Sequence, residues 1–93
     1  MIVRARELRR ETETLLASTL LAELAVVRTM CTLAKKESGA PRFGHIAQAE
    51  KAFRAVLALA TRVKPSQKAL DSIETARYQI SSLREQDISN RPQ

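Results

Sequence analysis

The most apolar stretch of the sequence is LLASTLLAELAVV, residues 15–27, and one charged residue, Glu23, interrupts it. A helix that spans a membrane needs about 20 apolar residues, and this run is shorter. A signal peptide begins with a basic segment free of acids, whereas Glu7, Glu11 and Glu13 precede this run. We therefore interpret the run as the buried face of a helix and expect a chain without a membrane segment.

The composition favours an all-α fold. Of the 93 residues 44% are hydrophobic, but there are only 2 Gly, 3 Pro, 2 Phe, 1 Tyr and no Trp. All-β domains of this size need frequent turn residues and β-branched or aromatic strands. The length allows one domain, which we expect over residues 1–88, with residues 89–93 as a loose tail. The single cysteine forms no internal disulfide, which favours a reducing compartment, the cytoplasm.

Two breaks in the pattern divide the chain into three expected helices. The first break is SGAPRFG, residues 38–44, where Gly39 fits the left-handed position after a helix end and Pro41 prevents continuation. The second is Lys64-Pro65-Ser66, because a proline is well tolerated as the first residue of a new helix. We expect helices over about residues 4–37, 44–63 and 65–88.

The apolar stripes on the two sides of Pro65 indicate whether it breaks or only kinks a long helix. Counted at about 100° per residue, their centres lie roughly 160° apart, so one straight helix would face two opposite ways. Folding the third helix back beside the second puts both stripes into one core. We favour a three-helix, up-down-up antiparallel bundle with a long first helix, and the alternative is a kinked helix. The expected core residues are Leu16, Leu20, Leu24, Val27, Cys31, Ala34, Ile46, Ala49, Phe53, Val56, Leu57, Ala60, Val63, Ala69, Ile73, Ala76, Ile80 and Leu83.

The first helix carries a second apolar strip, about 120° around its axis from the core stripe. The strip and the residue between the two stripes are Leu15, Ala22, Val26, Leu33 and Met30. A helix that is apolar over more than half its circumference should be buried on more than one side. The helix is also about 50 Å long, so its first dozen residues should project beyond the second helix. We predict a homo-oligomer, most simply a dimer that pairs first helix with first helix, and the alternative is a monomer in which the third helix covers the strip.

The net charge of +6 is concentrated in residues 35–68. The basic residues of this segment are Lys35, Lys36, Arg42, Lys51, Arg54, Arg62, Lys64 and Lys68, against two acids, Glu37 and Glu50. Clustered basic side chains raise the local potential, which suits a nucleic acid or an acidic protein as partner. The alternative is a solvated face without a partner, since no recognised DNA-binding module or aromatic stacking platform accompanies the charge.

The sequence contains no pattern that predicts catalysis, a metal site or a cofactor. We expect His45 to be a surface residue at a helix start and Cys31 to be a small core hydrophobe. A di-iron bundle would need inward Glu-x-x-His pairs, and the sequence has none. The favoured function is a helical interaction or scaffold protein that acts through homo-oligomerisation. The second hypothesis is a nucleic-acid-associated accessory protein, and an enzyme is not expected.

Overall fold

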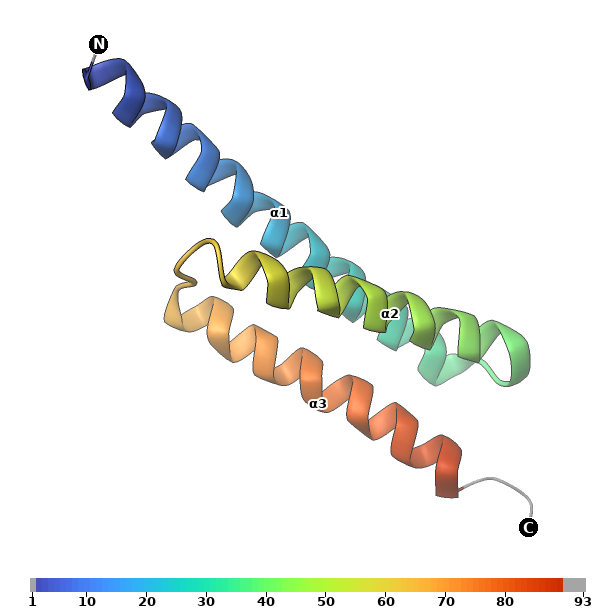
Figure 1. Ribbon diagram of the computed structural model, residues 1–93. Helices are drawn as coiled ribbons and strands as arrows, with labels where there is room; N and C mark the ends of the chain where they lie inside the picture. The colour runs from blue at the N-terminus through green and yellow to red at the C-terminus, as the bar shows by residue number, and fades with distance from the viewer. Residues whose placement is uncertain (1, 90–93) are drawn as a thin grey trace.

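The computed structural model describes the backbone of residues 2–89 and the side chains of residues 9–87. It has three helices, α1 (Ile2–Lys36), α2 (Gly39–Ala60) and α3 (Gln67–Ser89), and no strand within residues 2–89, so the all-α prediction is confirmed. Figure 1 shows α2 and α3 lying along the C-terminal part of α1, whose N-terminal turns extend beyond them. The molecule is therefore elongated, with principal extents of 66 × 22 × 17 Å.

The chain reverses between α1 and α2 over two residues, Glu37 and Ser38. Gly39 has a φ of 69°, which confirms the left-handed conformation predicted for it. Residues 39–43, which were expected to form a loop, belong to α2 instead. Pro41 lies in the first turn of α2, where backbone N–H groups have no acceptor within the helix, so the missing N–H costs no hydrogen bond. This proline marks the start of a helix.

The second reversal, residues 61–66, separates α2 from α3. Ser66 caps α3, because its Oγ accepts a hydrogen bond from the Ala69 backbone N–H at 3.1 Å. Pro65 immediately precedes this cap, so α3 begins two residues later than expected. Pro65 thus breaks the helix, and the alternative of one kinked helix is wrong.

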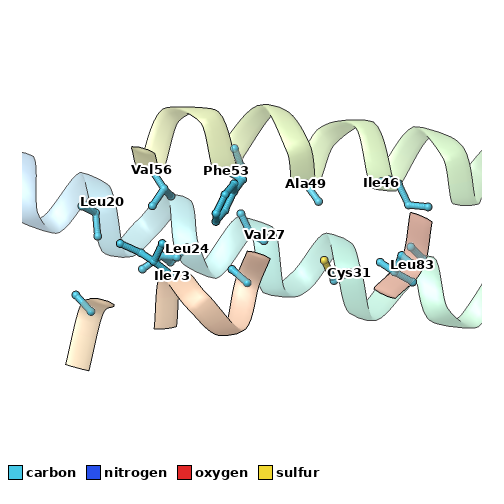
Figure 2. Close-up of a cluster of buried hydrophobic side chains, with 14 residues drawn as sticks. Leu20, Leu24, Val27, Cys31, Ile46, Ala49, Phe53, Val56, Ile73 and Leu83 are labelled. Atoms are coloured by element: carbon cyan, nitrogen blue, oxygen red, sulfur yellow. The ribbon is translucent and has the colours of Figure 1, made fainter. Parts of the chain in front are cut away.

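A single hydrophobic core joins the three helices, as Figure 2 shows. Its buried residues are Leu20, Leu24, Val27, Cys31 and Ala34 from α1, Ile46, Ala49, Ala52, Phe53 and Val56 from α2, and Ala69, Ile73, Ala76 and Leu83 from α3. All but Ala52 were predicted from the apolar periodicity. Of the remaining expected core residues, Leu57 is exposed and the others are half-buried. Burial raises the pKa of the Cys31 thiol, and the charge of Lys35 opposes this only in part, so Cys31 serves as a small core hydrophobe.

The two glycines provide a matched test of the first reversal. A Cβ added to either Gly39 or Gly44 meets no atom within 4 Å, so only the backbone conformation distinguishes the two sites. We expect Gly39→Ala to destabilise the fold by about 1–2 kcal/mol, because its φ is positive. Gly44→Ala should stabilise α2 by roughly 0.5–1 kcal/mol. Urea-induced unfolding at one protein concentration measures both, and equal shifts in the same direction would contradict this assignment.

Candidate interaction surface

The side of α1 that faces away from α2 and α3 is apolar and open to solvent. Leu15 is 67% exposed, Val26 38% and Leu33 37%, and Ala22 is exposed as well. Met30, at the edge of this side, is half-buried and packs against the core. The third helix therefore does not cover the predicted strip, contrary to the premise of the monomer alternative, and the oligomeric state stays a prediction.

Six exposed residues follow one another on this side at alternating spacings of four and three, the spacing of a coiled-coil seam. We call them the outer strip: Leu15, Thr19, Ala22, Val26, Thr29 and Leu33. From Thr14 to Leu33 the sequence has two charged residues, Glu23 and Arg28, and neither belongs to the strip. The strip is about 27 Å long at 1.5 Å per residue. A continuous uncharged apolar face of this kind is typical of an interaction site.

Two threonine hydroxyls on or beside the outer strip, those of Thr19 and Thr32, donate hydrogen bonds within the helix. The Thr19 hydroxyl donates to the Leu15 carbonyl oxygen at 2.9 Å. Beside the strip, the Thr32 hydroxyl donates to the Arg28 carbonyl oxygen at the same distance. A buried hydroxyl without a partner would oppose association, but these two keep their hydrogen bonds when the face is covered. These two hydroxyls therefore do not prevent this side of α1 from entering an apolar interface.

A shallow depression of about 390 Å³ lies beside the C-terminal end of the outer strip. It is lined by Ala25, Arg28, Thr29, Thr32 and Leu33. Small and hydroxyl-bearing residues leave room here for a side chain from a partner, and Leu33 provides an apolar wall. This end of the outer strip therefore borders a shallow, open surface of mixed polar and apolar residues.

Seven of the eight basic residues predicted to attract an anionic partner are exposed: Lys35, Lys36, Lys51, Arg54, Arg62, Lys64 and Lys68. They form three separate groups, at the end of α1, in the middle of α2 and around the α2–α3 reversal. The first and third groups lie at opposite ends of α2, whose 22 residues span about 33 Å, several times the distance over which salt screens exposed charges. The structure therefore distributes this charge along the molecule and does not gather it into one compact patch.

Arg42, the eighth predicted basic residue, points into the structure and its side chain is only 12% exposed. Its Nε donates to Asp87 Oδ1 and its Nη1 to the Ala34 carbonyl oxygen, both at 2.7 Å. Longer bonds of 3.4 Å run from Nη2 to the Leu83 carbonyl oxygen and to Gln86 Oε1. Arg42 thus joins the C-terminal ends of α1 and α3 to the first turn of α2, and it does not belong to an open anion-binding surface.

Two further charge contacts hold α3 against α2. Arg84 donates through both Nε and Nη2 to the Glu50 carboxylate, and this hydrogen bonding raises the pKa of the Arg84 guanidinium above its ordinary value. The Arg77 guanidinium carbon lies 5.3 Å from the centre of the Phe53 ring, a cation–π contact. The sequence placed Glu50 only as one of two acids in the basic segment, because its partner lies 34 residues away along the chain.

His45 contacts an acidic side chain at the first reversal of the chain. His45 Nδ1 lies 2.7 Å from Glu37 Oε2 at the α1–α2 reversal, and both side chains are partly exposed. Among the side chains that the structure describes, no group of three or more His, Cys, Asp or Glu residues could hold a metal ion. Around His45 the structure therefore shows a contact between helix ends.

The length and composition of α1 also resemble those of a membrane-spanning helix. By length and composition alone, residues Arg9–Lys36 would suffice to cross a membrane, and 22% of the apolar window is buried inside the molecule. Core helices of soluble proteins and signal sequences share these properties, so the properties alone do not indicate a membrane span.

Models of known families, curated protein sequences and solved structures give no match to this chain.

Substitution of Arg42 tests its role at the helix ends. Asp87 Oδ2 is buried and finds no hydrogen-bond partner among the described residues, so this carboxylate depends on the Arg42 charge. We expect Arg42→Ala to lower the free energy of unfolding by about 3 kcal/mol, because it leaves a largely buried carboxylate without its hydrogen-bonded cation. Arg42→Lys should recover only part of this loss, since lysine lacks the planar fork.

Lys51→Ala is the matched control, because Lys51 is exposed on the same helix. It should change the free energy of unfolding by less than about 0.5 kcal/mol. Chemical denaturation of the three variants gives the comparison. Equal stabilities of the Arg42→Ala and Lys51→Ala variants would show that Arg42 does not hold the helix ends together.

Proposed function

We propose that this chain is a small helical interaction protein that assembles as a homodimer through the outer strip of α1. In this proposal each subunit is an up-down-up bundle, and the α1 helices of two subunits form the centre of the assembly. The role is non-catalytic and cytoplasmic, and the exposed basic groups of α2 and the two reversals offer contacts to further partners.

The observation that carries this proposal is the exposure of the outer strip. Leu15, Val26 and Leu33 leave much of their apolar surface in water, and burying such surface contributes about 25 cal/mol per Å². The exposed surface of the strip is arranged at coiled-coil spacing and not scattered singly, and it has no charge to oppose contact. A second α1 has the matching spacing, so the chain itself is the simplest partner.

An arginine in the middle of the outer strip should separate the subunits. We expect Val26→Arg to weaken the dimer by about 2 kcal/mol or more, roughly thirtyfold in Kd, because each dimer would bury two unpaired charges. Light scattering over a range of concentrations measures the mass of the wild type and of the variant. Circular dichroism should show an unchanged helix content, since Val26 is not part of the core.

The matched control is Leu21→Arg. Leu21 is 58% exposed on the same helix but lies outside the outer strip, so this variant should keep the mass of the wild type. A monomeric wild type, or a Val26→Arg variant with unchanged mass, would contradict the proposed interface.

The second candidate function is a nucleic-acid-associated accessory role. The exposure of Lys51 and Arg54 on α2 and of Arg62 in the α2–α3 reversal favours it, since exposed basic side chains are available to contact phosphates. If it holds, the protein is retained on immobilised nucleic acid and released steeply as salt increases. Release at low salt, with little further dependence on the salt concentration, would count against this function.

A further inference from the structure

The outer strip has an internal symmetry that defines how two copies of it fit together. Its residues lie in pairs at equal distances along α1 from Leu24: Leu15 and Leu33 at nine residues, Thr19 and Thr29 at five, and Ala22 and Val26 at two. An antiparallel pair of identical helices is related by a twofold axis perpendicular to the helices. When this axis crosses the interface at the height of Leu24, each residue of the strip lies opposite the other member of its pair on the partner helix. In antiparallel coiled coils an a position of one helix faces a d position of the other. This register meets that condition, because each pair joins one residue of each kind.

We propose that two copies pair their α1 helices antiparallel, in the register that sets Leu15 against Leu33, Thr19 against Thr29 and Ala22 against Val26 of the partner. This proposal rests on the proposed function, because it names the orientation and register of the same dimer.

The side chains in this register complement one another. The two leucines form a large apolar contact at each end, and a small Ala22 receives a larger Val26 on either side of the axis. The Thr19 hydroxyl donates its hydrogen to the Leu15 carbonyl oxygen, and its oxygen can still accept a hydrogen bond. The hydroxyl of the facing Thr29 therefore finds an acceptor, and no polar group of this layer is left unpaired.

Charge favours the same orientation. Glu11 and Lys36 are exposed at opposite ends of the outer strip and project from the same edge of the helix, on the 100° count. In the antiparallel register Glu11 lies beside Lys36 of the partner at both ends of the interface. In a parallel pair Glu11 and Lys36 of the partner would lie at opposite ends of the interface, so this contact between opposite charges would be lost.

Disulfide cross-linking tests the orientation. Tagged Leu15→Cys protein is mixed with untagged Leu33→Cys protein under mild oxidation, and the wild type with its buried Cys31 gives the background. We expect a disulfide between the two variants, whereas either variant alone should cross-link no more than the wild type. In the antiparallel register two copies of residue 33 lie about 27 Å apart, far beyond disulfide reach.

A charge exchange tests the register independently of any cysteine. We expect Lys36→Glu to raise the Kd of the dimer about three- to tenfold, because it creates two like-charge contacts. The double substitution Glu11→Lys with Lys36→Glu should restore the Kd. Lys35→Glu is the control, since Lys35 projects away from the strip and should change the Kd by less than about twofold.

The outcomes separate this inference from the proposed function. If each cysteine variant cross-links with itself, or if the double charge variant stays as weak as Lys36→Glu, the antiparallel register is wrong although the dimer stands. A wild-type dimer without the mixed disulfide would overturn the register as well. If light scattering shows the wild type to be monomeric, the proposed function fails, and this inference fails with it.

Discussion

The structure depends on the burial of one side of α1 by two shorter helices. Val27, Cys31 and Ala34 of α1 are almost completely buried, and the core residues of α2 and α3 gather around this one stripe. Helix stability in proteins comes mostly from such packing, since isolated helices are marginal in water. Two helices can cover only part of a helix that is apolar over more than half its circumference. The same arrangement that builds the core therefore leaves the outer strip open.

Polar contacts between the helices add to the hydrophobic core and hold the helix ends together. Arg42 fixes the ends of α1 and α3 to the first turn of α2, and Glu50 near the middle of α2 pairs with Arg84 in the C-terminal part of α3. The charged side chains in these contacts are already paired within the molecule, so they are not available to a partner. The remaining exposed basic residues lie in separate groups, while the apolar surface of α1 is continuous. An assembly through α1 accordingly has more support than a function based on the basic charge.

Local periodicity predicted the elements that depend on local pattern. The core stripes of all three helices and the exposed strip with Leu15, Ala22, Val26 and Leu33 followed from spacing alone, because side chains at helical spacing share one face. The role of Arg42 did not, because its partner Asp87 lies 45 residues away and meets it only when the helix ends converge. The start of α2 was also missed. Pro41 is compatible with both a loop and a first helical turn, and only the reversal at Gly39 distinguishes the two.

The most direct test of this account is the solvent accessibility of leucine and valine methyl groups in the wild-type protein in solution. A soluble gadolinium chelate enhances the relaxation of methyl groups that water can reach, and NMR measures the effect residue by residue. The account predicts strong protection of Leu15, Val26 and Leu33 at high protein concentration, together with full enhancement at Leu21, which lies outside the strip. Enhancement of the strip methyls as strong as that of Leu21 at every concentration would contradict the claim that the outer strip is an interface.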